Sequence, residues 1–261
     1  MLFMLSPAKT LDYDSPLPPG IARRATAPQF NHQAAALIQQ LAPLAPPQVA
    51  ALMDLSDELA ALNVGRYAAW SPRATARNSR PAALAFNGDV YGGLQAATLS
   101  GSDWTWAQAH VVILSGLYGA LRPLDRLQPY RLEMGTALAN PRGRDLYAWW
   151  GDTLAEYLNQ RQPGPRKSVV VNLASVEYFR AARRPALRAR VVDCVFEDFK
   201  GGQYKVISFF AKRARGLMCR WAIDQRVGSV RALRGFDAEG YSFAVAESAP
   251  ERLVFRRRLV D

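Results

Sequence analysis

Histidine and cysteine are scarce in this chain of 261 residues, which holds two of each. Zinc and iron sites usually need such residues at short spacing, and His32 and His110 are far apart in the sequence. A Ser-His-Asp hydrolase would need one of these histidines, and no serine stands in a Gly-x-Ser-x-Gly turn. We therefore expect no metal site and no cofactor, and we expect Cys194 and Cys219 to be buried small apolar residues in a reducing compartment.

Long apolar stretches are also missing. The longest runs, such as Val111–Leu114 and Val169–Val171, fall far below the roughly 20 residues that a bilayer crossing needs. Met1–Leu5 is apolar, but the polar residues that follow interrupt it before the roughly 7–15 apolar residues of a secretion signal. These absences predict a protein without a membrane segment, in the cytoplasm.

Positive charge is abundant and unevenly distributed. The net charge is +11, from 33 basic and 22 acidic residues. Residues 1–150 hold 12 basic and 10 acidic groups, whereas residues 151–261 hold 21 and 12. A basic region of this kind is typical of polyanion binding, although an arginine-rich, alanine-rich composition also follows from a GC-rich genome.

Helical periodicity is visible in five segments, and each is expected to pack against a core. Asn31 can cap a helix through Leu41, Pro46 and Pro47 can start a second helix, and Ser56 can cap a third. In the third, Leu59, Leu62 and Tyr67 share one face at helical spacing. The two remaining segments are Gly143–Arg161 and the basic Ala211–Val227.

Short β-branched or aromatic runs alternate with these helices and predict strands. No linker or repeat divides the chain. We expect an α/β fold of the mixed α+β kind, a single compact domain with a mixed sheet and helices on both faces. The predicted strands are Leu2–Leu5, Ala82–Phe86, Val111–Leu114, Ser168–Leu173, Val191–Phe196, Tyr204–Phe210, Tyr241–Val245 and Leu253–Arg256.

Polar turns follow four of the predicted strands directly. Ligands of open α/β sheets bind outside the carboxyl ends of strands, so parallel neighbours would bring these turns together. The alternative is that polar turns follow strands in every protein. The residues expected in a shared anion pocket from these turns are Ser6, Lys9, Ser115, Tyr118, Asn172, Ser175, Lys212 and Arg215.

A fifth segment, Arg122–Gly135, interleaves arginines with carboxylates. Arg122 and Arg131 can recognise phosphate in a bidentate manner, and we add both to the expected pocket. The same residues can instead form an architectural ion network with Asp125 and Glu133. The glycine-rich Asn87–Gly93 matches neither the Walker pattern nor the dinucleotide fingerprint and can be a loop of close approach.

The composition does not exclude an enzyme that uses lysine and carboxylate side chains for catalysis. Lys9 and Lys212 are candidates for an amine activated by neighbouring cations, and the candidates for acid or base are Glu177, Asp89 and Glu133. Such an enzyme would act on a small substrate that carries phosphate or carboxylate.

Seven motifs along the chain together resemble the YaaA family of bacterial peroxide stress proteins. They are SPAKTLDY at Ser6–Tyr13, GDVY at Gly88–Tyr91, LSGLYG at Leu114–Gly119, LRPLD at Leu121–Asp125, PYRLEMG at Pro129–Gly135, NLAS at Asn172–Ser175 and AKRARGLM at Ala211–Met218. The resemblance implies a family-specific compact fold, DNA binding through a positively charged cleft and a helix-hairpin-helix element, and a role in limiting free iron and DNA damage. Pro47–Leu55 with Glu58–Tyr67 is the candidate for that element.

The leading hypothesis is a protein of the peroxide-stress response that binds double-stranded or branched DNA mainly through its backbone. The alternative is an enzyme acting on a small anionic substrate in the strand-end pocket. The residues expected to form the nucleic-acid surface are Arg180, Arg183, Arg184, Arg188, Arg190, Arg213 and Arg220.

Overall fold

One mixed sheet organises the chain. The structure is a computed structural model that describes residues 1–162, 164 and 167–258. Its strands are β1 (Leu2–Leu5), β2 (Thr10–Leu11), β3 (Arg80–Pro81), β4 (Phe86–Asn87), β5 (Val111–Ser115), β6 (Gly119–Leu121), β7 (Arg126–Leu127), β8 (Val169–Asn172), β9 (Arg190–Lys200), β10 (Gln203–Lys205), β11 (Ser242–Phe243) and β12 (Arg252–Arg257). Eight of them form a sheet in the order β11-β12-β9-β8-β1-β5-β6, with β10 paired to β9.

The centre of this sheet is parallel and its margins are antiparallel. β1 pairs in parallel with β5 and with β8, and β9 pairs in parallel with β8 and β12. β6, β10 and β11 pair antiparallel with their neighbours. β1 is buried along its whole length, as expected for a central parallel strand that is covered on both faces. The predicted α/β fold with a mixed sheet is confirmed.

Helices connect and cover the strands. They are α1 (Ile21–Arg24), α2 (Asn31–Leu41), α3 (Pro46–Met53), α4 (Asp57–Ala69), α5 (Ala82–Ala85), α6 (Asp89–Leu94), α7 (Gly101–His110), α8 (Leu146–Trp150), α9 (Thr153–Gln160), α10 (Val176–Arg180), α11 (Ser208–Asp224) and α12 (Val230–Leu233), with 3₁₀ turns at Ala96–Thr98 and Ala238–Gly240. α3 begins at Pro46, and Ser56 caps α4 by accepting the Leu59 N–H, as the sequence predicts.

Three predicted elements are wrong in kind or length. Ala82–Ala85 is helical rather than extended, because a short run that is buried on every side has no periodicity to distinguish helix from strand. Asn31 was also predicted as an N-cap, but it is the first residue of α2 and Phe30 is the N-cap. The strand predicted over Tyr204–Phe210 ends at Lys205, and α11 begins three residues later. The helix predicted over Gly143–Arg161 is divided into α8 and α9 at Gly151, whose φ of 47° leaves the helical region.

The buried face of α4 also differs from the prediction. Leu59 and Leu62 are 38% and 48% exposed, whereas Ala60, Asn63 and Tyr67 are buried. These three lie at helical spacing, and the Tyr67 hydroxyl donates to the Arg131 carbonyl. Hydrogen bonding to the neighbouring loop therefore selects a face that hydrophobicity alone does not select.

Two helices meet at glycines. A Cβ atom added at Gly216 of α11 would lie 1.8 Å from the Val90 carbonyl oxygen of α6, and one at Gly93 of α6 would lie 2.3 Å from the Arg213 carbonyl oxygen. Only glycine permits backbones this close. The glycine-rich segment Asn87–Gly93 is thus a place of close approach between helices.

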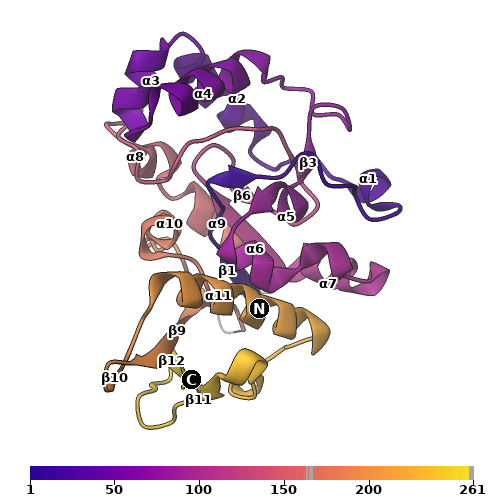
Figure 1. Cartoon of the computed structure of the whole chain (residues 1–261), viewed down its shortest axis with the longest axis vertical. Helices are drawn as coiled ribbons and strands as arrows, with labels where there is room; N and C mark the ends of the chain where they lie inside the picture. The colour runs from indigo at the N-terminus through magenta and orange to yellow at the C-terminus, as the bar shows by residue number, and fades with distance from the viewer. Residues whose placement is uncertain (163, 165–166, 259–261) are drawn as a thin grey trace.

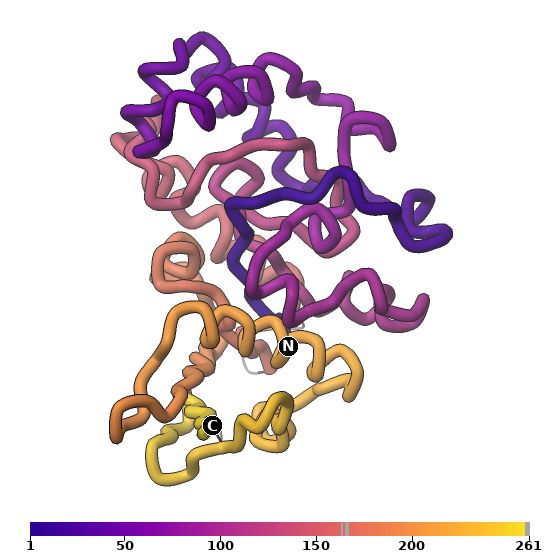
Figure 2. Tube along the Cα trace, in the orientation of Figure 1, coloured from indigo at the N-terminus to yellow at the C-terminus, as the bar shows by residue number. Residues whose placement is uncertain are grey.

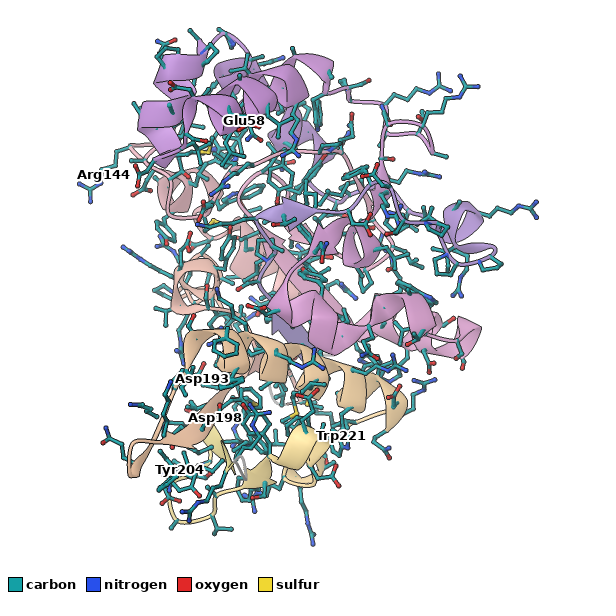
Figure 3. All side chains as sticks on the ribbon, viewed as in Figure 1. Glu58, Arg144, Asp193, Asp198, Tyr204 and Trp221 are labelled. Carbon is teal, nitrogen blue, oxygen red and sulfur yellow. The ribbon has the colours of Figure 1, made fainter. Side chains whose placement is uncertain are left out.

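The molecule has two distinct ends. α2, α3 and α4 lie at one end, and β9 to β12 with α11 lie at the other (Figure 1). The first strand runs through the middle, while the C-terminal segment stays at the α11 end (Figure 2). Figure 3 places Glu58 at the helical end and Asp193, Asp198 and Tyr204 at the opposite end. Among the described residues, we find no helix with the length and apolar character for a bilayer crossing.

Candidate functional site

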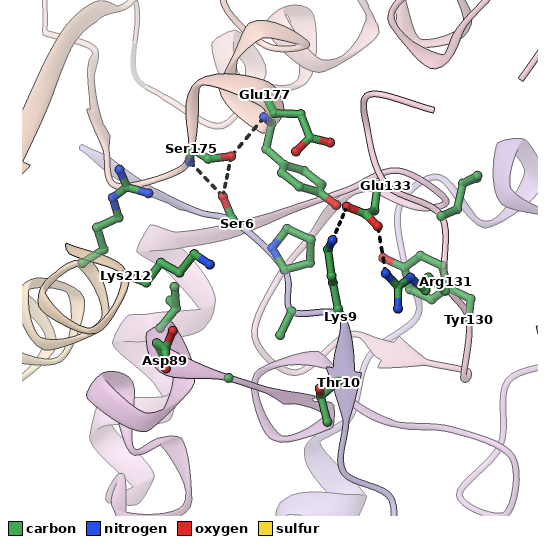
Figure 4. Close-up of a pocket in the computed structure, with 17 residues that line it drawn as sticks. Ser6, Lys9, Thr10, Asp89, Tyr130, Arg131, Glu133, Ser175, Glu177 and Lys212 are labelled. Atoms are coloured by element: carbon green, nitrogen blue, oxygen red, sulfur yellow. Dashed lines mark hydrogen bonds and ion pairs between the residues drawn. The ribbon is translucent and has the colours of Figure 1, made fainter. Parts of the chain in front are cut away.

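A cavity of about 430 Å³ lies at the edge of the sheet where β1 and β8 end. The carboxyl ends of parallel neighbours share one edge, so the turns after these strands meet there. We call this space the strand-end cavity. Six of the ten residues expected in a shared pocket line it: Ser6, Lys9, Arg131, Ser175, Lys212 and Arg215. The candidate catalytic residues Lys9, Asp89, Glu177 and Lys212 line it as well (Figure 4).

The two serines join the turns that follow β1 and β8. The Ser175 N–H donates to Ser6 Oγ at 2.8 Å, and Ser175 Oγ accepts the Tyr178 N–H as the N-cap of α10. The Tyr91 hydroxyl donates to the Ser6 carbonyl at 3.0 Å, which ties the same turn to α6. These bonds tie the turns after β1 and β8 to each other and to α6.

One wall carries a chain of three charges. Glu133 accepts from Lys9 Nζ at 3.1 Å through one carboxylate oxygen and from Arg131 Nη2 at 3.2 Å through the other (Figure 4). Arg131 Nε is buried without a hydrogen-bond partner among the described residues. This wall has one more positive charge than negative charge, and its arginine retains a free donor.

A second carboxylate is held in position by the backbone. The Gly135 N–H donates to Glu177 Oε1 at 2.9 Å, and the glycine packs so closely that an added Cβ would lie 3.2 Å from that oxygen. The adjacent Tyr178 lines the cavity, and burial raises the pKa of its hydroxyl. The phenol therefore stays protonated and can act as a hydrogen-bond donor to a ligand.

Two cations from α11 complete the cavity. Lys212 and Arg215 lie at adjacent turns of this helix, beside Asp89 at the start of α6. Neither has a carboxylate oxygen within 4 Å in the part of the chain that the structure describes. Burial lowers the pKa of the Arg215 guanidinium, as desolvation of an uncompensated cation does. The described lining thus carries four cations and three carboxylates, a net charge of one positive, and its two α11 cations are the ones without a carboxylate within 4 Å.

Four residues expected in this pocket lie elsewhere. Ser115 and Tyr118 are fully buried behind it, where Ser115 Oγ lies 2.6 Å from the Tyr130 hydroxyl and Tyr118 accepts from the Trp70 indole. Ser115 ends β5 and Tyr118 lies in the turn before β6, and both side chains are buried in the core. Arg122 pairs with the buried Asp125 at 3.0 Å, so its role there is the architectural ion network. Asn172 turns away to donate to Asp193 at 2.8 Å.

Most arginines of the expected nucleic-acid surface are neutralised. Arg180 stacks over Tyr147, and Arg188 is exposed. The other five form ion pairs: Arg183 with Asp193, Arg184 with Asp152, Arg190 with Glu251, Arg213 with Glu239 and Arg220 with Asp224. These seven arginines therefore do not form a continuous unpaired surface, because four of them face carboxylates from other segments and one faces Asp224 a turn along α11.

The candidate helix-hairpin-helix segment consists of α3 and α4. The residue with positive φ between these helices is Asp54 (52°), where a glycine would be the usual choice. Asp57 and Glu58 follow in the first turn of α4. The connection is thus acidic.

Thr10 of β2 and Tyr178 of α10 are polar lining residues that were not among the expected pocket residues. Their signal was their closeness along the chain to Lys9 and Ser175, which were expected in the pocket. Residues 1–162, 164 and 167–258 hold no group of three or more histidine, cysteine or acidic side chains arranged to bind a metal ion.

Comparison with known proteins gives a consistent result over the whole chain. A family model described as peroxide stress protein YaaA matches residues 1–247. The UPF0246 protein of Leptothrix cholodnii is 65% identical over 261 residues, 100% of each chain. The UPF0246 proteins of Paracidovorax citrulli and Variovorax paradoxus are 61% and 58% identical and cover 99% of this chain and of their own. This chain therefore belongs to the YaaA family of peroxide stress proteins.

Proposed function

We propose that this protein acts in the peroxide-stress response by binding DNA, and that it holds the phosphate backbone at the strand-end cavity. The observation that carries the proposal is the pair Lys212 and Arg215, which face this cavity without a carboxylate partner among the described residues. A phosphate supplies the missing negative charge. Contacts of this kind recognise the backbone, so we expect binding without sequence preference.

The ion-paired arginines have a smaller part in this proposal. Arg183, for example, is 2.9 Å from Asp193 and would have to give up that carboxylate before it met a phosphate. The segment that joins α3 to α4 has no part in this proposal, because Asp54, Asp57 and Glu58 repel phosphate and no basic side chain lies beside them in the sequence. The proposed contact is therefore local to α11 and the turns after β1 and β8.

The proposed effect on free iron is indirect. Iron sites in proteins usually use histidine, cysteine or clustered carboxylates. Two of the three carboxylates that line the strand-end cavity are already bonded, Glu133 to Lys9 and Arg131 and Glu177 to the Gly135 N–H. Protection of DNA is the direct action in this proposal. Tight stoichiometric binding of Fe(II), measured by anaerobic calorimetry, would contradict it.

A second candidate function is catalysis on a small anionic substrate in the same cavity. The observation in its favour is that Glu133, Glu177 and Tyr178 face a confined space beside Lys9. Carboxylates, a phenol and an amine that line one confined space are suited to acid–base chemistry. No particular reaction is proposed.

The test is binding of a labelled duplex across a salt series, measured by fluorescence anisotropy. We compare the wild type with Lys212→Gln and, as a matched control that also removes one exposed positive charge, Arg188→Gln. Loss of one phosphate contact should weaken binding and reduce the log–log salt slope by about 0.9. We expect this change for Lys212→Gln and no change for Arg188→Gln.

Three other results would contradict or change this proposal. Weaker binding by Arg188→Gln, with unchanged binding by Lys212→Gln, would place the phosphate contact on the expected nucleic-acid surface instead. A wild-type protein that does not bind duplex, single-stranded or branched DNA at low salt would refute DNA binding. Displacement of DNA by a free phosphomonoester at low concentration would favour the second candidate.

A further inference from the structure

A second cavity, of about 620 Å³, lies at the other edge of the sheet. Gln108 and Ala109 line it and directly precede β5, whereas the strand-end cavity lies where β1, the parallel neighbour of β5, ends. Arg122 also lines it and follows β6, which runs antiparallel to β5. The two cavities are therefore separated by the length of the strands. We call this one the arginine cavity.

Three arginines from distant segments converge on it. Arg24 comes from α1, Arg122 from the turn after β6 and Arg161 from the end of α9. No carboxylate lines the cavity in the described part of the chain. Arg122 is neutralised from behind by the fully buried Asp125 at 3.0 Å. Arg24 and Arg161 form no ion pair with a described residue, so two positive charges remain without compensation.

These two guanidinium groups are held in place by neutral acceptors. Arg24 donates to the Gly101 carbonyl and to the Thr105 hydroxyl, each at 2.9 Å. Arg161 donates to the Tyr157 hydroxyl at 3.1 Å and to two carbonyls of α7 at 3.1 and 2.6 Å, and its guanidinium carbon lies 5.7 Å from the centre of the Tyr157 ring. Hydrogen bonds to neutral groups fix the orientation of each guanidinium and leave its positive charge uncompensated. A ligand thus meets cations that have already lost most of their side-chain freedom.

We infer that the arginine cavity binds a phosphomonoester dianion. Two uncompensated charges match the charge of this group near neutral pH, and a guanidinium offers paired N–H donors to phosphate oxygens. The volume of the cavity is larger than a phosphate group alone occupies, so the ligand carries an organic part of up to about nucleotide size. Gln29 lines the cavity and supplies a neutral hydrogen-bonding group for it, whereas the Thr26 hydroxyl is already bonded to Asp125 and Gln108.

The test is calorimetric titration of the full chain with AMP, with inorganic phosphate and with adenosine, which lacks the phosphate. The variants are Arg24→Gln, Arg161→Gln and the conservative Arg24→Lys, which keeps the charge and loses the fork. Arg23→Gln is the matched control, because this arginine is exposed on the same short helix and does not line the cavity. Lys212→Gln reports on the strand-end cavity.

We expect AMP and phosphate to bind the wild type, Arg23→Gln and Lys212→Gln alike, and adenosine not to bind. Arg24→Gln and Arg161→Gln should each weaken AMP by about tenfold or more, with Arg24→Lys in between. Affinity should fall as the pH drops through about 6, where the phosphate loses its second charge. Circular dichroism checks that each variant is folded. If Arg161→Gln fails to fold, the two Arg24 variants decide the matter.

Several results would overturn the inference. These are absence of AMP and phosphate binding by the wild type, equal binding of adenosine, and unchanged affinity in both Arg24 variants. Loss of binding in Lys212→Gln alone would assign the ligand to the strand-end cavity instead. If the wild type binds duplex DNA but not AMP, and Arg24→Gln loses the DNA binding, the ligand of the arginine cavity is DNA and not a small phosphomonoester.

Discussion

Replacement of Gly216 by alanine tests the contact that holds α11 against α6. The new Cβ would lie 1.8 Å from the Val90 carbonyl oxygen, about 1.6 Å short of the 3.4 Å at which ordinary contact begins. This neighbour is backbone, so no side-chain rotation can relieve the overlap, and the helices must separate. Overpacking typically costs about 1–3 kcal/mol, and we expect about 3 kcal/mol here because two backbones are involved. The helix propensity of alanine offsets up to about 1 kcal/mol of this.

The control is the same substitution at a glycine with free space. Gly65 lies inside α4, and a Cβ there would meet no atom within 4 Å. Gly65→Ala should therefore stabilise the protein by about 0.5–1 kcal/mol, through helix propensity alone. The two variants carry the same chemical change in a helix interior and are expected to shift stability in opposite directions.

Urea and thermal unfolding, followed by circular dichroism, give both values. At about 2–4 °C per kcal/mol for a domain of this size, Gly216→Ala should lower the melting temperature by several degrees and Gly65→Ala should raise it slightly. Because α11 carries Lys212 and Arg215, the first variant should also weaken any ligand of the strand-end cavity. A Gly216→Ala protein as stable as the wild type would refute the close approach of the two helices.

Three further predictions concern buried or paired groups. Asp125→Ala leaves the Arg122 charge uncompensated and should cost about 3–5 kcal/mol in denaturant unfolding, and a loss below about 1 kcal/mol would contradict the buried pair. Hydrogen bonding from Ser100 holds the pKa of Asp103 at about 2, against 3.8 in the unfolded chain. The ionised Asp103 carboxylate therefore stabilises the folded state fully above pH 3.8, and this contribution is lost as the pH falls towards 2. In Asp103→Asn, the free energy of unfolding should vary less with pH over that range. Burial raises the pKa of Cys219 to about 12, so mass spectrometry should find this thiol unmodified by peroxide or alkylating agents in the native protein, and rapid modification would contradict its burial.

Local signals in the sequence predicted much of the fold correctly. The strands β1, β5 and β8 are short β-branched or aliphatic runs, and α3 and α4 begin at the predicted proline and serine. These signals succeed because proline geometry and N-capping act within a few residues. They fail where burial is uniform, as in Ala82–Ala85, because such a segment has no polar face.

The pattern of parallel strands also explains why the turns around the strand-end cavity could be anticipated. Once β1 and β8 are parallel neighbours, Ser6 and Ser175 must share an edge. The α11 cations reach the same edge for a different reason, which is the glycine contact between α11 and α6. Lys212 and Arg215 were expected there because they follow a strand predicted to reach Phe210, but β10 ends at Lys205 and both residues lie inside α11.

The sequence by itself determined the family, the α/β class and the turns that follow the central strands, since each of these depends on residues that are close together along the chain. Only the tertiary structure decided which charges remain unpaired. Arg183 and Arg213 meet carboxylates from other segments, whereas Lys212, Arg215, Arg24 and Arg161 meet none among the described residues. The physical reason is that an ion pair forms over a few ångströms, and that distance between remote positions is set by packing rather than by order along the chain.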